Sequence, residues 1–483
     1  MHVLFVCRTR YDDILEHQHL SLESLKGRIP PMKLMSRCKF LTRLSIFRLC
    51  LITGLAVCIT ATAGLTAPSS AQKEQVTLTA ILEDQGDPGR WQTLLQPAMQ
   101  ELRARHPDMD IQLNHTTYPY DKTRAELLTA MSNQTPIDLI TVDPIWLGEF
   151  VEKGFLTDLT NRTENWERSS DWYEMHWDGG VYNDKIYAIW AWSDIRGMWY
   201  WKDLLNEAGV DPNSLKTWDG YIDSAKKLNA ALEGKGIEGM HLVAAGHSPD
   251  MSFYPYLWML GGEILEWKGG HPSRGTYWYP AYNSTEGVRA LEFIDEQINA
   301  GIKPQKNHFW GKEFLDRKFA VMLEALQHHV HLNNTEQKQD FEKKVGFLPM
   351  FPVPNQGNSS ATMMGGWLLT IPEMSRNKDL AWELITILLE PKILVPYLAR
   401  HGNLPTQVPI GEGPYSSELS RSIPYYEELI SMIQIGRIRP SIPMYPEISD
   451  HIRQALDEVF FASKEPEQAL DDAAQKSAKI LGW

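Results

Sequence analysis

Between residues 76 and 153, strand-like and helix-like segments alternate along the chain, and this alternation restricts the possible folds more than any other feature of the sequence. Short runs of β-branched residues predict strands at 76–82, 111–113 and 138–142. Apolar residues at helical spacing predict helices at 91–105, 122–131 and 145–153. Strands that alternate with helices predict an α/β unit with a mainly parallel sheet, and ligands bind beyond the carboxyl ends of such strands.

A second set of helices follows and indicates a second α/β region. Helical spacing predicts these helices at 202–208, 221–232, 286–300, 380–389 and 447–462. Thr217 is suited to cap the helix that begins shortly after it. The 483 residues exceed what one ordinary core holds, so we expect two domains. Because no Gly/Ser-rich linker separates the two regions, we expect the chain to cross between two lobes several times.

Residues 1–71 have the features of a leader. A basic region at 33–48 precedes an apolar run at 49–67, and small residues lead up to Ala71. These are the parts of a secretory signal peptide, so we expect cleavage after Ala71. The apolar run is also long enough to be considered as a permanent membrane anchor, which is the rival interpretation.

Two further features of the leader concern its lipidation and its start. A lipoprotein signal needs a small residue before the acceptor cysteine, and Val57 before Cys58 departs from that pattern, so a lipid anchor has weak support. Residues 1–31 do not fit ahead of a signal peptide, and we expect them to be an upstream extension with Met32 or Met35 as the more natural start.

Cysteine and charge exclude several classes of function. All four cysteines lie before residue 71, so the remaining chain forms no disulfide and no thiolate metal site, and it has no Cys nucleophile. Residues 1–71 hold nine basic and four acidic residues, which leaves a net charge of −19 on the rest of a chain whose total is −14. Such an acidic surface repels nucleic-acid phosphates and anionic lipid heads.

Five stretches of sequence together resemble a known family. Their characteristic residues are Trp146-Leu147, Tyr200-Trp201-Lys202-Asp203-Leu204, Gly365-Gly366-Trp367, Gly402-Asn403-Leu404-Pro405-Thr406 and Arg439-Pro440. In this order and spacing they resemble the extracellular solute-binding proteins of family 1, in the branch that binds maltose and trehalose. The patterns around Trp367 and Arg439 are most similar to those of binders of trehalose, sucrose and compatible solutes such as glucosylglycerol.

The resemblance implies the fold and the function. It implies an α/β, two-lobed periplasmic-binding-protein fold of type II, with a ligand cleft at the hinge. The first lobe would comprise 72–192 and 345–393, and the second 193–344 and 394–483. The protein would be a monomeric, periplasmic receptor of an ABC importer that closes on a small glycoside and delivers it to the membrane permease. It would be no enzyme and would need no cofactor.

The resemblance also implies which residues bind the ligand. A sugar presents apolar C–H faces and hydroxyl rims, so its site needs flat aromatic rings and bidentate polar groups. The residues that match such positions are Asp84, Asp87, Arg124, Asp143, Trp192, Asp194, Tyr254, Trp258, Gly366, Trp367 and Arg439.

Each of these candidates also has a purely structural explanation. Asp143 could cap the helix that follows it, and Arg124 could lie on a solvated helix face. Trp192 could point inward from a buried strand, whereas that explanation does not account for Asp194. The Gly366-Trp367 pair could form a turn beside a core ring. A buried helix could equally explain Tyr254, Tyr256 and Trp258.

Three other functions remain as alternatives. A receptor for maltooligosaccharides would use the same kinds of residue. A glycoside hydrolase could use Asp143 and Asp194 as its pair of acids, although no acid is marked as lying in an apolar pocket. A metal receptor could use His328, His329 and His331, although no converging ligands are evident elsewhere in the sequence.

Overall fold

The computed structural model describes residues 73–483 except for 85, 88, 245–251, 269–276, 307–310, 326–334, 356–358 and 462. The expected cleavage after Ala71, the possible lipidation of Cys58 and the three histidines at 328, 329 and 331 therefore lie outside the described residues. No helix in the described part of the chain is long and apolar enough to span a bilayer.

The larger sheet has seven strands in the order β16-β6-β15-β3-β1-β2, and β17 pairs with β15. These strands are β1 (Glu74–Glu83), β2 (Met109–Tyr118), β3 (Leu139–Val142), β6 (Ile189–Ile195), β15 (Thr362–Thr370), β16 (Leu404–Pro405) and β17 (Gly436–Arg437). All four residues of β3 are buried in the middle of the sheet, which explains why three of them are apolar and the fourth is the β-branched Thr141. The strands predicted from the sequence at the start of the chain are confirmed.

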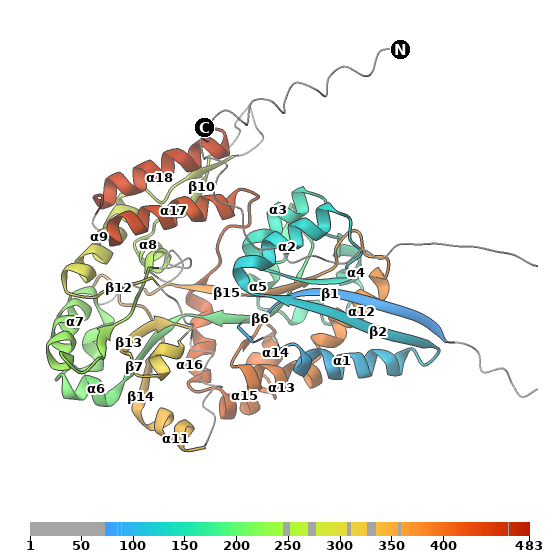
Figure 1. Cartoon of the computed structure of the whole chain (residues 1–483), viewed down its shortest axis with the longest axis horizontal. Coiled ribbons are helices and arrows are strands. Elements are labelled where there is room, and N and C mark those ends of the chain that lie inside the picture. Colours follow the sequence, from blue (N-terminus) through green and yellow to red (C-terminus); the bar gives the residue numbers. More distant parts are fainter. Residues whose placement is uncertain are drawn as a thin grey trace, which may run out of the picture. The chain divides into compact units, whose positions relative to one another are not determined.

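Helices cover this larger sheet. They are α1 (Gln92–Arg105), α2 (Tyr120–Ser132), α3 (Leu147–Glu152), α4 (Thr160–Glu164), α5 (Glu174–Asp178), α12 (Lys378–Leu388) and α13 (Pro391–His401). Helix α1 packs against α12 and α13, although almost three hundred positions separate them in the sequence (Figure 1). The helices predicted at the start of the chain are confirmed to within a few residues, and a 3-10 turn, η1 (Pro144–Trp146), opens the third of them.

The smaller sheet has four strands in the order β14-β7-β13-β8. These strands are β7 (Gly197–Trp201), β8 (Glu238–Met240), β13 (Phe319–Glu324) and β14 (Val345–Leu348). Two short pairs accompany it, β9 (Leu242–Val243) with β12 (Pro304–Gln305), and β10 (Leu265–Trp267) with β11 (Trp278–Pro280). All six residues of β13 are buried, so the core of this lobe surrounds that strand.

The helices of the second lobe are α6 (Lys202–Glu207), α7 (Trp218–Leu232), α8 (Tyr254–Met259), α9 (Thr285–Asn299), α11 (Thr335–Lys344), α17 (Tyr445–Phe460) and α18 (Pro466–Leu481). The longer ones, such as α7, α9, α17 and α18, are amphipathic, whereas the short α8 is buried almost all round. Thr217 caps α7 as predicted, because its side chain accepts a hydrogen bond from the Gly220 N–H. Helices α14 (Val408–Gly411), α15 (Ser416–Ser422) and α16 (Tyr426–Ser431) follow α13 along the chain.

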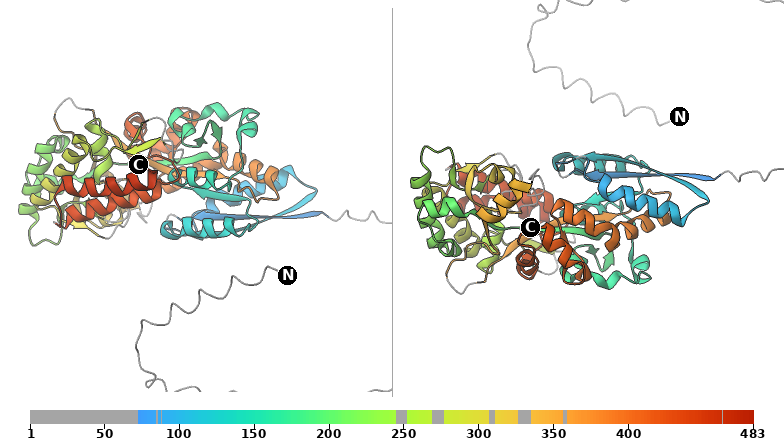
Figure 2. Two further views of the ribbon diagram at one scale, coloured as in Figure 1. Left: turned by 90° about the horizontal axis from the view of Figure 1, so that it is seen from above. Right: turned by 90° about the horizontal axis from the view of Figure 1, so that it is seen from below.

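The chain passes between the two lobes three times. Strand β6 continues through Arg196 into β7, the chain returns from β14 to β15, and residues 438–444 lead from β17 to α17. Figures 1 and 2 show the resulting two lobes, with α17 and α18 against the green and yellow elements and β6 and β15 running between the lobes. The expected repeated crossing without a flexible linker is therefore present.

The α/β fold is confirmed, and both sheets are mixed. Strands β1, β2 and β3 pair in parallel, whereas β15 is antiparallel to β3 and β6, and β7 is antiparallel to β13 and β14. The crossings between the lobes produce the antiparallel pairings. A strand that enters a sheet from the other lobe runs antiparallel to the strands that it joins. Lobes defined by their sheets would also place β14 in the second lobe and β16 in the first, on the other side of the boundaries expected at 345 and 394.

Candidate functional site

Asp143 and Arg439, two predicted ligand residues almost three hundred positions apart, form a buried ion pair. Asp143 follows β3, and Arg439 lies in the connection from β17 to α17. The Arg439 Nη2 atom is 3.0 Å from Asp143 Oδ1 and 3.3 Å from Oδ2, and each side chain is 7% exposed. The structure therefore brings the two residues together at a point where the chain crosses between the lobes.

The Asp143 carboxylate has two further donors. Its Oδ2 accepts a hydrogen bond from the Tyr120 hydroxyl at 2.9 Å, and its Oδ1 accepts one from the Ile145 N–H at 3.1 Å. The second bond caps η1, so the structural explanation considered for Asp143 is also present. Four hydrogen bonds on one carboxylate fix its position, and they hold the Arg439 guanidinium in one orientation.

An aromatic cluster adjoins this ion pair. The ring centroids of Tyr120, Trp146 and Trp367 lie 5.5 to 6.0 Å apart in all three pairings, and Trp367 meets each of the other two edge-on. Tyr120 belongs to both groups, because its hydroxyl binds Asp143. We call Tyr120, Asp143, Trp146, Trp367 and Arg439 the crossing cluster. It combines flat rings with fixed charged groups, which is the combination that binds sugars.

At Gly366, neighbouring atoms of β6 leave no room for a side chain. Its φ is +141°, and a Cβ there would come within 2.2 Å of the Trp192 carbonyl oxygen and 2.4 Å of Trp190 Nε1. The close packing of β15 on β6 therefore requires this glycine, rather than a close approach to a ligand. Gly366 is nevertheless the one residue of β15 that is not fully buried.

Trp192 points into the core of the first lobe. It is 0% exposed, and its ring lies 5.1 Å from that of Trp91 and 5.0 Å from that of Tyr397. Its Nε1 has no hydrogen-bond partner among the described residues. The structural explanation, in which Trp192 points inward from a buried strand, accounts for this ring. We therefore expect removal of this ring to destabilise the core of the first lobe.

Asp194 lies at the end of β6 and belongs to a charged group at the first crossing. Its Oδ1 is bonded to Nη1 of Arg196, and the Arg196 Nε lies 3.9 Å from Oε1 of Glu324. Asp194 is the most exposed of the three, with 16% of its side chain accessible against 5% and 0%. Sequence reasoning missed Arg196 and Glu324, although an arginine within an apolar strand was a usable signal.

Asp84 and Asp87 follow β1 and bend the chain locally. Their Oδ1 atoms accept hydrogen bonds from the Gly86 and Gly89 N–H groups at 2.8 and 3.0 Å. Arg90, which the sequence analysis missed, is buried beside them and donates from Nε to the Tyr397 hydroxyl at 2.6 Å. The loop after β1 therefore contacts, through Arg90, the same Tyr397 ring that packs against Trp192.

Arg124 pairs with another residue of the first lobe. Its Nε and Nη2 atoms lie 2.8 and 2.6 Å from Oε2 of Glu149, and 36% of its side chain is exposed. This agrees better with the explanation of a solvated helix face than with a role beside Asp143.

Tyr254 and Trp258 lie on α8, which packs against β15. The Tyr254 hydroxyl is 3.0 Å from the hydroxyl of Tyr445, and Tyr254 itself is fully buried. The Arg437 guanidinium lies 5.1 Å from the centre of the Trp258 ring, two positions before Arg439 in the chain. Trp258 therefore lies near the start of the connection that holds Arg439, and Tyr254 lies near its end.

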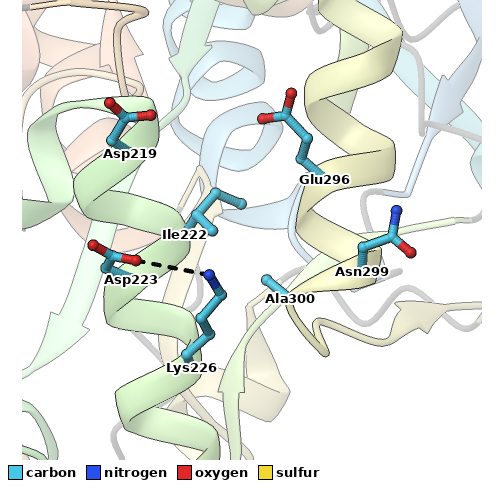
Figure 3. A pocket seen from close by; sticks show the side chains of 7 residues that line it. All are labelled: Asp219, Ile222, Asp223, Lys226, Glu296, Asn299 and Ala300. Carbon is cyan, nitrogen blue, oxygen red and sulfur yellow. Dashed lines mark ion pairs between the residues drawn. The ribbon is translucent and has the colours of Figure 1, made fainter.

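A separate hollow of about 520 Å³ opens between α7 and α9 on the second lobe (Figure 3). Its polar lining consists of Asp219, Asp223, Lys226, Glu296 and Asn299, and Lys226 Nζ is 3.8 Å from Asp223 Oδ1. None of the predicted ligand residues lines it. No group of His, Cys, Asp and Glu among the described residues has the arrangement of a metal site.

Comparisons with known proteins agree on one family. Residues 89–393 match the family model of bacterial extracellular solute-binding proteins. A putative binding protein of Brucella abortus is 25% identical over 390 residues, which cover 77% of this chain and 86% of that protein. An arabinooligosaccharide-binding protein of Bacillus subtilis is 20% identical over 297 residues, which cover 59% of this chain and 64% of that protein.

Solved structures show the same fold. The maltose-bound MalE3 of T. maritima has a TM-score of 0.70 and 25% identity, and the match covers 84% of this chain and 99% of that one. A tagatose-bound solute-binding protein of Thermotoga lettingae has a TM-score of 0.69 and 23% identity, with 84% and 100% covered. The two-lobed arrangement of sheets and helices is thus shared with these proteins.

Proposed function

The chain belongs to the bacterial extracellular solute-binding proteins, the sugar-binding components of ABC transporters, and from this premise we propose that it captures a small glycoside at the crossing cluster and delivers it to a membrane permease. Family members are binding proteins rather than enzymes, and they act outside the cytoplasm. The leader at 1–71, with cleavage after Ala71, would direct secretion to the periplasm.

The observation that carries the proposal is the crossing cluster itself. An arginine and a carboxylate, both 7% exposed and fixed by mutual hydrogen bonds, lie beside three aromatic rings. The fixed pair suits hydroxyl groups, since the guanidinium donates and the carboxylate accepts, and the rings suit C–H faces. Because Arg439 lies in a connection between the lobes, a bound ligand would favour one arrangement of the lobes over another.

The ligand class that we propose is a disaccharide or a compatible solute, such as trehalose, sucrose or glucosylglycerol. This choice rests on the sequence around Trp367 and Arg439. Similar structures hold maltose, tagatose, ribitol or acarbose, and maltose and acarbose among these make a maltooligosaccharide the natural competitor in any test.

Tryptophan fluorescence of the purified protein tests the proposal. We expect a saturable change with one or two members of a panel of trehalose, sucrose, glucosylglycerol, maltose, maltotriose and glucose, because Trp146 and Trp367 belong to the site. In Arg439→Gln that response should be lost, whereas Arg453→Gln, which removes a partly exposed and ion-paired arginine of α17, should respond as the wild type does. A flat response of the folded protein to the whole panel would contradict the proposed ligand class.

A further inference from the structure

Arg437, two positions before Arg439, joins the two lobes at the start of the connection that carries Arg439. It is the last residue of β17, which pairs with β15 in the larger sheet. Its Nη2 atom lies 3.0 Å from Oε1 and 2.9 Å from Oε2 of Glu263 in the second lobe. Its guanidinium also lies over the Trp258 ring, with Cζ 5.1 Å from the ring centroid. We call Trp258 and Glu263 the arginine socket, because one guanidinium contacts both of them.

The end of α8 builds the arginine socket. Gly261, with a φ of +88°, donates from its N–H to the Trp258 carbonyl oxygen at 3.0 Å. The Gly262 N–H donates to the Leu257 carbonyl oxygen, also at 3.0 Å. These two bonds form the Schellman motif, which ends a helix with a residue in the left-handed conformation. Trp258 in the last turn and Glu263 directly after the motif are therefore held at the same end of α8.

The connection 438–444 is attached to α8 at both of its ends. At its start, Arg437 lies in the arginine socket at the end of the helix. At its far end, the Tyr445 hydroxyl lies 3.0 Å from the hydroxyl of Tyr254, the first residue of the helix. Arg439 lies between these two attachments, and its side chain belongs to the crossing cluster. Helix α8 thus holds the segment that supplies the arginine of the site.

The surroundings of Trp258 favour a role in the socket over direct stacking on a sugar. The Arg437 guanidinium already lies over its ring, and a cation in that position is attracted by the ring face. The Tyr254 ring packs beside it, with centroids 5.6 Å apart and an interplanar angle of 35°. A sugar that stacks on an aromatic ring needs an open face. Trp258, predicted from the sequence as a ligand residue, is therefore better placed to hold Arg437.

We propose that Arg437 is a positioning residue of the sugar site, which acts on Arg439 through the connection between them. With Arg437 in the arginine socket, the connection is fixed before a sugar arrives, so little conformational freedom is lost on binding. Without this attachment, the connection gains freedom that the sugar has to remove, and the affinity falls. The inference rests on the proposed function, because it concerns the same site.

The dependence of binding on salt concentration reports on this ion pair. The side chains of Arg437 and Glu263 are 40% and 49% exposed, so dissolved ions screen their attraction. The buried pair of Asp143 and Arg439, 7% exposed on each side, is screened much less. A neutral sugar brings no charge of its own. Salt dependence that is lost with Arg437 therefore originates in the contact of Arg437 with the socket.

Fluorescence titration with a sugar of the panel, in about 0.01 M and about 1 M sodium chloride, tests the inference. At low salt, Arg437→Gln should weaken binding roughly threefold to tenfold, because an ion pair and a cation–π contact are lost. Glu263→Gln should act in the same direction. High salt should weaken binding to the wild type towards the value of Arg437→Gln, whereas that variant should change little. Arg437→Lys retains the cation and should recover part of the loss.

Two further variants complete the experiment. Arg453→Gln is the matched control, since it makes the same change at a partly exposed, ion-paired arginine of α17 outside the connection. It should bind as the wild type does at both salt concentrations. Trp258→Phe should weaken binding when Arg437 is present and have little effect in Arg437→Gln, because the two residues act together. Thermal unfolding would verify that all variants are folded.

Three results would overturn the inference. The first is that Arg437→Gln binds the sugar as tightly as the wild type at low salt. The second is that Arg437→Gln retains the salt dependence of the wild type, or that Arg453→Gln weakens binding as much. The third is that Trp258→Phe weakens binding by the same factor with and without Arg437, since Trp258 would then contact the sugar directly.

A measurement without sugar separates this inference from the proposed function. Amide hydrogen exchange within 438–444 should be faster in Arg437→Gln than in the wild type and in Arg453→Gln, because one attachment of the connection is lost. Unchanged exchange would overturn the inference whatever the titrations show. If the exchange responds and no sugar of the panel binds to the wild type, the proposed function is wrong, and the role of Arg437 in holding the connection stands. If a sugar binds equally to all variants, only the inference is wrong.

Discussion

At the scale of single residues, the contact that most shapes the crossing cluster is the pair of Asp143 and Arg439. Both side chains are 7% exposed, so neither charge has water to replace a lost partner. In Asp143→Asn we expect a loss of about 3 kcal/mol in the free energy of unfolding, because the arginine would remain buried without its countercharge. Urea denaturation measures this loss.

The double variant Asp143→Asn/Arg439→Gln is the control for that prediction. With both charges removed, much of the lost stability should return, since the penalty arises from one uncompensated charge rather than from the absence of the pair. If the double variant is as unstable as the sum of the single ones, the two residues do not act as a pair.

Trp192 has a structural role at the same scale. Its ring is fully buried between Trp91 and Tyr397, so Trp192→Ala leaves a large cavity and should cost roughly 3 to 5 kcal/mol in the free energy of unfolding. Trp192→Phe should cost clearly less, because it retains part of the volume. Chemical denaturation of both variants measures the difference, and wild-type stability of Trp192→Ala would contradict the core assignment.

His176 gives the stability of the protein a dependence on pH. Burial lowers the pKa of its imidazole to about 3, and the ring packs edge-on against Trp190 at 4.9 Å. The unfolded chain, with an ordinary histidine pKa near 6.5, binds a proton that the folded protein does not. Stability should therefore fall as the pH falls from about 6.5 towards 3.

The variant His176→Phe tests this effect. It keeps an aromatic ring beside Trp190 and has no titrating group, so its stability should fall less than that of the wild type between pH 7 and pH 5. Equal losses in the two proteins, measured by thermal unfolding at each pH, would assign the acid sensitivity to other groups.

At the scale of the elements, the packing of β15 on β6 controls the geometry of the site. The two adjacent glycines of β15 differ in what a side chain would meet. A Cβ at Gly366 would strike the Trp192 backbone at 2.2 Å, whereas one at Gly365 would meet the tips of Asp194 and Arg196 at 2.8 and 2.9 Å. Gly366→Ala should therefore strongly destabilise the fold. Gly365→Ala should cost less stability, and it should weaken sugar binding if Asp194, which stays a predicted ligand residue outside the crossing cluster, contacts the sugar, because the added methyl group displaces its carboxylate.

Denaturation and fluorescence titration of these two variants separate the effects. Each serves as the control for the other, since both add one methyl group to neighbouring positions of the same strand. Equal stability of the two variants would contradict the assigned cause, which is contact with rigid backbone at one position and with side-chain ends at the other.

The sequence predicted local elements well and their contacts poorly. Helices such as α9 and α17 follow from apolar spacing alone, because each buries one face whatever its neighbour is. The antiparallel entry of β15 and the placement of β16 depend on pairings between distant segments, which periodicity does not contain.

The same limit applies to the candidate site. Asp143 and Arg439 were each predicted from the family resemblance, but the sequence did not show that these two residues, 296 positions apart, pair with each other. The charge group at the first crossing was missed in part because Glu324 comes from the other sheet. For Arg124, the sequence showed the helix but not Glu149, which takes up its guanidinium.

At the scale of the whole molecule, the three connections between the lobes couple them. The connection to α17 also packs closely on the first lobe, since a Cβ on Gly148 of that lobe would come within 1.7 Å of the Ser441 carbonyl oxygen. One lobe therefore cannot unfold without releasing contacts of the other. We expect calorimetry of the wild type to show a single cooperative transition.

The bound sugar should raise the temperature of that transition as a whole. A ligand present at a hundred times its Kd stabilises the folded state by about 2.7 kcal/mol. If the site lies at the crossings, this stabilisation applies to both lobes, and the transition should shift upward without splitting. A sugar that shifted only part of the heat-absorption peak would bind within one lobe, and the crossing cluster would then not be its site. Arg439→Gln, which alters the cluster, should melt at the same temperature with and without the sugar, whereas Arg453→Gln should show the full shift.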